Sequence, residues 1–201
     1  AASLGISKRM LLAGELVHRA VGAQGLARLA AHSSDTVRGW ICYALAREHT
    51  LHSPAEPLEN LLEAVRPFAD DAHFGVREWA WMAVRPHLAK QPERALSYLA
   101  GWTADPSERV RRFASESTRP RGVWCAHLNI LKENPALGLP VLEPLRADPS
   151  TYVQDSVGNW LNDAAKSQPQ WVSDLCDAWL AQNPGKATAR ICKRALRSLH
   201  K

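Results

Sequence analysis

The stretch Asp105-Pro106-Ser107-Glu108-Arg109-Val110-Arg111 is predicted to open a helix, and its pattern decides the fold because it recurs along the chain. Each copy places Asp or Ser shortly before a valine, where these side chains can cap a helix. The valines of the four clearest copies lie 34 to 43 residues apart: Val37, Val76, Val110 and Val153. This spacing is the length of a two-helix repeat of the HEAT or armadillo kind.

The residues around these valines support helix pairs. Four positions after each valine comes another small or aliphatic residue, the i to i+4 contact of a buried helix face: Ile41, Ala80, Ala114 and Val157. First helices are predicted between the copies, at residues 58–68, 92–102, 136–145 and 171–182. An earlier helix carries an apolar stripe with helical period: Leu11, Leu12, Leu16, Val17 and Val21. The sequence therefore predicts an all-α, HEAT-like repeat α-solenoid, a single domain over residues 1–201, whose second helices line one concave face.

The composition is that of a folded soluble protein. The 201 residues are 46% hydrophobic and 22% charged. No apolar run approaches the roughly 20 residues that a membrane-spanning helix needs. The four cysteines are far apart and form no Cys-x-x-Cys pair, which argues against a zinc site or a disulfide framework. We expect a cytoplasmic protein without metal or cofactor, associated with the nucleoid if it is bacterial.

Basic residues are concentrated near the end of the chain. The net charge is +5 and the pI about 9.2, an excess that suits a nucleic-acid partner. From Gly185 onward no acidic residue occurs, and four cations recur on one predicted helix face: Arg190, Arg194, Arg197 and Lys201. Since a merely solvated helix face rarely excludes acids so completely, these residues are predicted to contact phosphates.

A second basic segment, residues 108–124, contains five arginines against two glutamates. Pro120 disfavours the helical conformation of Arg119 and lacks a backbone donor, so the helix is predicted to end near Thr118. Trp124 follows this break, where a flat ring could contact a sugar or a base. The alternative is a solvated helix whose arginines pair with its own glutamates, or whose last arginines bond helix-end carbonyls.

The sequence lacks the signatures of several enzyme classes. It contains no Gly-rich phosphate loop, no His-Glu-x-x-His and no nucleophile elbow. His49 and His52 straddle a predicted helix end, which does not favour a metal site there. What remains as potential chemistry is a wall of arginines, tryptophans and a few carboxylates.

Two segments resemble a known family. Residues 114–124, Ala-Ser-Glu-Ser-Thr-Arg-Pro-Arg-Gly-Val-Trp, are similar to the Ala-Ser-Glu-Gly-Thr-Arg-Pro-Arg-Leu-Pro-Trp signature of the AlkC branch of AlkC/AlkD-type DNA alkylation-repair glycosylases. Residues 152–166 resemble a second segment of that branch, and residues 194–197 match its closing basic helix. The resemblance implies a HEAT-like solenoid that cups duplex DNA and releases N3- or N7-alkylated purines without flipping the base.

The resemblance also implies roles for individual residues. Asp163 matches the second catalytic acid, and Trp124 matches an aromatic residue that contacts the lesion. Where the family pattern has Glu-Phe-Ala-x-Arg-Pro, this chain has Trp-Met-Ala-Val-Arg-Pro at residues 81–86. Trp81 thus occupies the position of the first acid and is assigned to the lesion contact, while Glu78, one helical turn earlier, is the substitute acid. Three further arginines are assigned to DNA: Arg85, Arg119 and Arg121.

Each assignment has a structural alternative. Asp163 could pair with Lys166, Glu78 could bridge to a neighbouring arginine, and Trp124 could be a packing residue. Trp160 lies on an apolar stripe and is predicted to be buried. For the whole protein we expect a monomer that binds double-stranded DNA, as a glycosylase or as a non-catalytic relative that recognises distorted or branched DNA. A repeat scaffold that binds protein is the third hypothesis.

Overall fold

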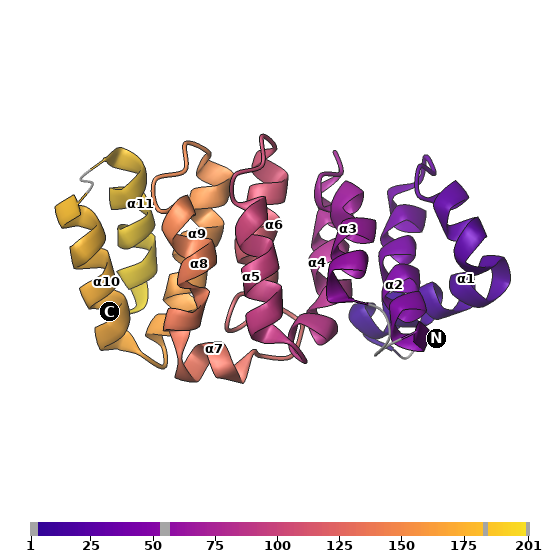
Figure 1. Ribbon diagram of the computed structural model, residues 1–201, viewed down its shortest axis with the longest axis horizontal. Helices are drawn as coiled ribbons and strands as arrows, with labels where there is room; N and C mark the ends of the chain where they lie inside the picture. The colour runs from indigo at the N-terminus through magenta and orange to yellow at the C-terminus, as the bar shows by residue number, and fades with distance from the viewer. Residues whose placement is uncertain (1–3, 53–56, 183–184, 200–201) are drawn as a thin grey trace. The chain divides into compact units, whose positions relative to one another are not determined.

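The computed structural model describes residues 4–52, 57–182 and 185–199, which form helices and no strand (Figure 1). The all-α helical repeat prediction is therefore confirmed. The contacts of the chain fall into two compact units, Ala1–Leu88 and Ala89–Lys201, and each is described by itself. The single-domain assignment stays a prediction, and Lys201 lies outside the described residues.

The first unit contains two helix pairs, which are α1 (Ile6–Leu29) with α2 (Asp35–His52) and α3 (Leu58–Ala69) with α4 (Phe74–Leu88). The second helices α2 and α4 pack against each other, as a HEAT-like repeat requires. Helix α1 approaches α2 closely at Gly14, where an added Cβ would lie 2.4 Å from Cβ of Tyr43. The absence of a side chain at this position therefore allows the first pair to form.

Helix α1 leaves several of its large apolar side chains exposed. Gly22 has φ 60° and interrupts the helix. Leu11 and Leu16 of the apolar stripe are 58% and 55% exposed, whereas Met10 and Gly14 are buried against the rest of the unit. The close approach at Gly14 therefore places the small residue, and not the most apolar side chains, against α2.

The second unit contains three helix pairs and a short connecting segment. Its first helices are α5 (Pro92–Trp102), α8 (Leu139–Leu145) and α10 (Pro169–Gln182), and its second helices are α6 (Glu108–Ser117), α9 (Thr151–Ala165) and α11 (Lys186–Ala195). Helix α7 (Asn129–Glu133) and the 3₁₀ turn η1 (Pro135–Gly138) precede α8, and a second 3₁₀ turn, η2 (Leu196–Ser198), follows α11. Helix α9 packs between α6 and α11, so the three second helices lie side by side (Figure 1).

The predicted caps and core residues of this unit are present. The hydroxyls of Ser107 and Ser150 accept hydrogen bonds from the backbone two residues on, at the starts of α6 and α9. Trp160 is fully buried, as predicted, and its Nε1 donates to the carbonyl oxygen of Thr118 at 3.0 Å. The end of α6 is therefore tied to the middle of α9.

Arginine–aspartate pairs join successive repeats within each unit. In the first unit Arg38 donates from Nε and Nη2 to the two carboxylate oxygens of Asp71, at 2.6 and 3.0 Å. In the second unit Arg111 binds Asp148 in the same way, at 2.7 and 3.1 Å. Both arginines directly follow a repeat valine, so the sequence pattern that defines the repeat also encodes this contact.

Each pair also organises the loops around it. The Nη1 of Arg111 donates to the carbonyl oxygens of Asp105 and Pro106, in the loop that precedes its own helix. Asp148 accepts a further bond from the backbone N–H of Ser150, which shapes the turn before the next second helix. A single ion pair thus fixes two loops and the spacing of two repeats.

The pairs also affect protonation. Burial opposes the charge of Asp71, but the hydrogen bonds from Arg38 and from the backbone of His73 outweigh it and hold the pKa of Asp71 below its ordinary value. The pKa of Arg38 is raised, chiefly by its hydrogen bond to Asp71.

Within the described part of the chain, no helix combines the length and the apolar character that crossing a bilayer requires.

We expect Arg111→Met to lower the free energy of unfolding by about 3–5 kcal/mol, because it leaves the buried carboxylate of Asp148 without its cation. Urea denaturation followed by circular dichroism measures the change. Lys193→Met removes a charge from an exposed position and serves as the control, with an expected change within about 0.5 kcal/mol. Equal effects of the two substitutions would contradict a structural role for the pair.

Candidate nucleic-acid interface

The centre of the candidate site is an ion-pair network between α6 and α9. Arg119 lies just past the end of α6, where Pro120 stops the helix, and its guanidinium reaches across to α9. Its Nε and Nη2 lie 2.9 and 2.8 Å from Oδ2 of Asp163, and its Nη1 donates to Glu116 at 2.7 Å. One arginine therefore bridges two carboxylates.

Asp163 is an acidic residue, yet it is only 4% exposed. Its second oxygen, Oδ1, lies 3.4 Å from Nζ of Lys166, so the predicted pairing with that lysine is present but long. The stronger partner is Arg119, which holds Oδ2 through two nitrogens. The result is a buried carboxylate that two cations hold in a fixed orientation.

Glu116 is a member of this network that the sequence analysis treated only as a partner for helix arginines. It is buried, and its Oε2 accepts a hydrogen bond of 2.7 Å from the hydroxyl of Ser156 on α9. Ser115 in turn donates to the same hydroxyl at 2.8 Å. The only sequence signal for this role is a run of small polar residues around a glutamate in α6, a pattern that equally fits a solvated face.

The network shifts the protonation of its members. Burial opposes the charge of Glu116, but Arg112 and Arg119 outweigh it and hold the pKa of Glu116 below its ordinary range. For Arg119 burial likewise opposes the charge, and the carboxylates of Glu116 and Asp163 raise its pKa. Both groups are therefore charged at neutral pH in a largely dry environment.

Trp124 lies on the loop between α6 and α7 and is presented to solvent. Its side chain is 76% exposed, and its backbone φ of 58° lies in the left-handed region, which is unusual for a bulky residue. Residues with unfavourable backbone geometry concentrate at functional sites. The exposed indole is therefore not a packing residue, and its contact with a ligand stays a prediction.

Arg121 precedes Trp124 by three positions and is bound to the C-terminal end of α9. Its Nε donates to the backbone oxygen of Asp163 at 3.2 Å, and its Nη2 donates to the hydroxyl of Ser167 at 2.7 Å. The structure thus differs from the predicted phosphate contacts for Arg119 and Arg121. The first holds carboxylates, and the second bonds a helix-end carbonyl, which was the structural alternative.

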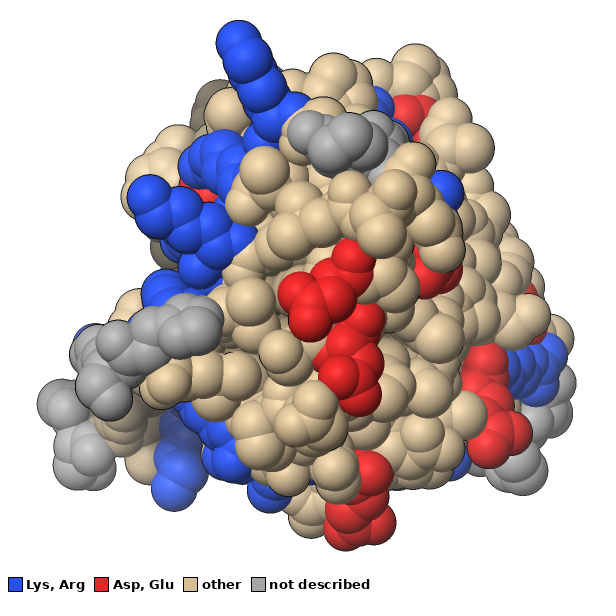
Figure 2. Space-filling view, turned by 90° about the vertical axis from the view of Figure 1, so that its left-hand side faces the viewer, with Lys and Arg blue, Asp and Glu red and all other residues tan. Residues whose placement is uncertain are grey.

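Helix α11 carries the basic residues of the tail. Figure 2 shows the end of the molecule at which α10 and α11 lie, with most of the Lys and Arg in view gathered along its left side. Arg190 and Arg194 both pair with Asp155 of α9, at 2.7 and 3.1 Å, and are partly exposed. Nη2 of Arg197 donates to Asn159 at 3.1 Å. The acid that the tail lacks is therefore supplied by the neighbouring helix.

The first-unit candidates, Glu78, Trp81 and Arg85, lie on one side of α4. Trp81 is 2% exposed, and its Nε1 donates to Oε2 of Glu78 at 2.9 Å. Arg85 is also buried, which differs from its assignment to DNA phosphates, because α4 packs against both α2 and α3. The structure brings Glu78 and Trp81 together in the first unit, and Asp163 and Arg119 together in the second.

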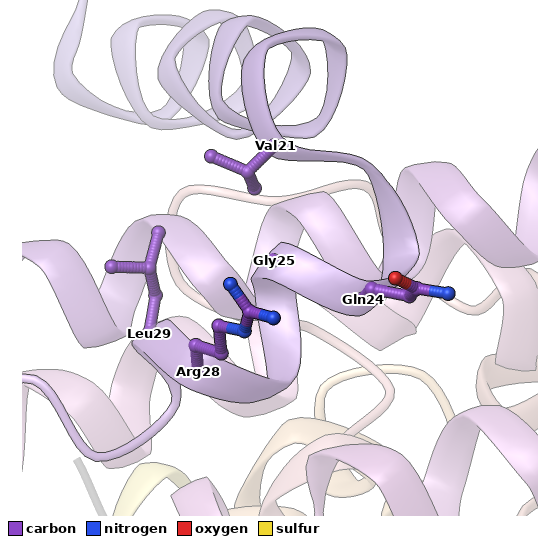
Figure 3. Close-up of a pocket in the computed structure, with 5 residues that line it drawn as sticks. All are labelled: Val21, Gln24, Gly25, Arg28 and Leu29. Atoms are coloured by element: carbon purple, nitrogen blue, oxygen red, sulfur yellow. The ribbon is translucent and has the colours of Figure 1, made fainter.

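The described residues also form a pocket at the bend of α1. Figure 3 shows this pocket of about 390 Å³ with its five lining residues: Val21, Gln24, Gly25, Arg28 and Leu29. It contains one cation and no carboxylate, and none of the predicted site residues lines it. Among the residues that the structure describes, no group of three or more His, Cys, Asp or Glu side chains could hold a metal ion.

Together these features define a helical-repeat protein with a buried, cation-bound carboxylate, an exposed tryptophan on a loop that is bonded to the same helix, and a basic final helix. The family model described as DNA alkylation repair enzyme matches residues 44–199. This chain belongs to the DNA alkylation repair enzyme family.

Individual relatives agree with this membership. The uncharacterized protein YhaZ of Bacillus subtilis strain 168 is 37% identical over 139 residues, which are 69% of this chain and 38% of YhaZ. The Pseudomonas fluorescens alkylpurine DNA glycosylase AlkC, solved bound to DNA containing an abasic site analog, matches with a TM-score of 0.66 and 27% identity over 96% of this chain and 62% of AlkC. AlkD2 from Streptococcus mutans shares the fold, with a TM-score of 0.73 and 21% identity over 97% of this chain and 90% of AlkD2. The chain thus spans less than two thirds of YhaZ and of AlkC.

We expect Glu116→Gln to lower the free energy of unfolding at neutral pH. We also expect the free energy of unfolding of this variant to fall less than that of the parent when the pH is lowered. A lowered pKa stabilises the folded state while the carboxylate is charged, so this contribution is present above a pH of about 4.3 and is lost as the pH falls further. The difference in unfolding free energy between the parent and Glu116→Gln should therefore narrow between pH 7 and pH 3. Urea denaturation at a series of pH values measures it, and a constant difference would argue against the charged network.

Proposed function

We propose that this protein binds duplex DNA and hydrolyses the N-glycosidic bond of N3- or N7-alkylated purines without flipping the base. The observation that carries the proposal is the arrangement at Asp163, whose buried carboxylate is held by Arg119 and whose backbone oxygen binds the loop of the exposed Trp124. Membership of the DNA alkylation repair enzyme family and the likeness to an alkylpurine DNA glycosylase solved with DNA support the same substrate class.

The reaction depends on stabilisation of the positive charge that develops on the sugar more than on acid catalysis. An alkylated purine already carries a positive charge, so it leaves with the electron pair of the bond to C1′ and becomes neutral. Positive charge then develops on the sugar, where a nearby carboxylate stabilises it. Water adds to C1′ and releases a proton, which leaves an abasic site.

Asp163 is the residue of the second unit that suits this role. Its carboxylate is oriented by Arg119, and Oδ1 is more weakly bound by Lys166. These cations weaken the negative field of the carboxylate, but they fix its orientation. The ring of Trp124 adds cation–π stabilisation to a cationic base or sugar.

Binding to DNA is assigned to the basic final helix. Lys186, Lys193 and Arg197 are exposed, and Arg190 and Arg194 are partly exposed. Cations of this kind neutralise phosphates and release counterions, which provides affinity without sequence preference. The bonds that Asp155 and Asn159 make to this helix orient its arginines before DNA arrives.

A second candidate function is recognition of distorted or branched DNA without turnover. The observation that favours it is the identity of residue 81, where the family pattern has a glutamate and this chain has a buried tryptophan. Loss of one of two carboxylates would cost a few kcal/mol of transition-state stabilisation, on the order of 100-fold in rate or more. A protein-binding repeat scaffold, the third hypothesis, predicts no steep dependence on salt.

The enzymatic proposal predicts release of 3-methyladenine from a duplex that carries this base. Asp163→Asn should slow release by about 100- to 1000-fold, because the amide offers no charge to the developing cation. Asp177→Asn, at an exposed position of α10, is the matched control and should act as the parent does. If the parent releases no base above background, the enzymatic proposal fails, and if Asp163→Asn is unimpaired, the assignment of Asp163 fails.

The DNA-binding proposal predicts that affinity for undamaged duplex falls steeply with salt. The double variant Arg194→Met/Arg197→Met should bind more weakly and show a slope of log K against log salt that is smaller in magnitude by about 1 to 2. Arg9→Met/Arg28→Met removes the same charge from α1 and should leave the slope unchanged. Fluorescence anisotropy measures both, and equal slopes for the two double variants would remove α11 from the interface.

A further inference from the structure

We propose that Arg121 is a positioning residue that fastens the loop of Trp124 to the end of α9 that carries Asp163, rather than a contact to DNA phosphate. This inference deepens the proposed function and rests on it for its catalytic meaning. Its structural part, the fastening of the Trp124 loop to α9, can be tested without activity.

The first observation is that two arginines converge on one residue. Arg119 and Arg121 flank Pro120, and both reach Asp163 from α6 and the loop that follows it. Arg119 binds the carboxylate, with Nη2 at 2.8 Å from Oδ2, whereas Arg121 binds the backbone oxygen, with Nε at 3.2 Å. The acid and the loop are therefore located relative to each other by a pair of neighbouring side chains.

The second observation concerns what holds the loop. At one end the N–H of Leu128 donates to the carbonyl oxygen of Pro120 at 3.0 Å, which closes the loop upon itself. Trp124 is 76% exposed, so its own packing contributes little to its position, and its left-handed backbone is unfavourable for a bulky side chain. The bonds of Arg121 to Asp163 and Ser167 attach this loop to the end of α9.

The third observation is the geometry of the guanidinium. Its Nε and Nη2 donate in a fixed fork to a carbonyl oxygen and a hydroxyl that lie on one helix end. A lysine offers one ammonium group on a flexible stem and does not reproduce this fork. Cations near the last turn of a helix also interact favourably with its carbonyl end. Arg121 thus has a structural role that depends on its shape as well as its charge.

Two readouts in the absence of damaged DNA test the proposal. The first is acrylamide quenching of Trp124 emission, obtained as the difference between each protein and the same protein with Trp124→Phe. The second is the salt slope for binding of undamaged duplex. For Arg121→Met and Arg121→Lys we expect altered quenching and an unchanged slope. Unaltered quenching, or a slope smaller in magnitude by about 1 as for a lost phosphate contact, would overturn the proposal.

Ser167→Ala tests the same anchor by a smaller change and serves if the arginine variants do not fold. It should alter the quenching of Trp124 in the same direction, with an unchanged salt slope, and no change in quenching would overturn the proposal. With 3-methyladenine duplex, Arg121→Met should slow the rate constant of base release by about 100-fold, with KM near that of the parent. If the parent releases no base, the proposed function fails, while quenching and salt slope still decide the role of Arg121.

Discussion

The bond between an arginine of one repeat and an aspartate of the next is the interaction on which the structure of each unit depends. Arg38 with Asp71 and Arg111 with Asp148 use two nitrogens on two oxygens, while the third nitrogen binds carbonyl oxygens of the preceding loop. Apolar packing alone would permit neighbouring helices to slide. The directional fork of the guanidinium removes that freedom and fixes where each second helix begins.

The position of the candidate acid follows from this constraint. Asp148 shapes the turn before α9, and Asp163 lies near the other end of the same helix. Trp160 lies between them in the sequence, and its Nε1 donates to the end of α6. Its ring fills the space beside Gly138 of η1, where an added side chain would clash with it. Consequently α9 is held at its start, its middle and its end, and a rigid element carries the carboxylate. Preorganisation of this kind allows a charge to stabilise a transition state without rearrangement.

Arginines of the second unit illustrate how context divides one residue type among several tasks. Arg111 joins repeats, Arg119 orients a carboxylate, and Arg121 attaches a loop to a helix end. Arg190 pairs with Asp155 and remains partly exposed to solvent. Each guanidinium keeps its charge, so total charge does not distinguish these tasks. Burial and the available acceptors distinguish them. A buried cation needs fixed hydrogen-bond partners, whereas a solvent-exposed cation can exchange its water for phosphate.

Local signals in the sequence determined the helices of this protein. Ser107 and Ser150 cap, Pro120 stops a helix, and the repeated valines set the pairs, because each acts within a few residues and needs no distant partner. Only the tertiary structure decided what the side chains of these helices do. Trp81 is buried, Glu116 becomes the hub of a network, and Asp155 pairs with arginines 35 and 39 residues later in the chain. Those outcomes depend on which helices pack against each other. An ion pair or a buried helix face requires a partner on another helix, and the periodicity of one helix does not specify that partner.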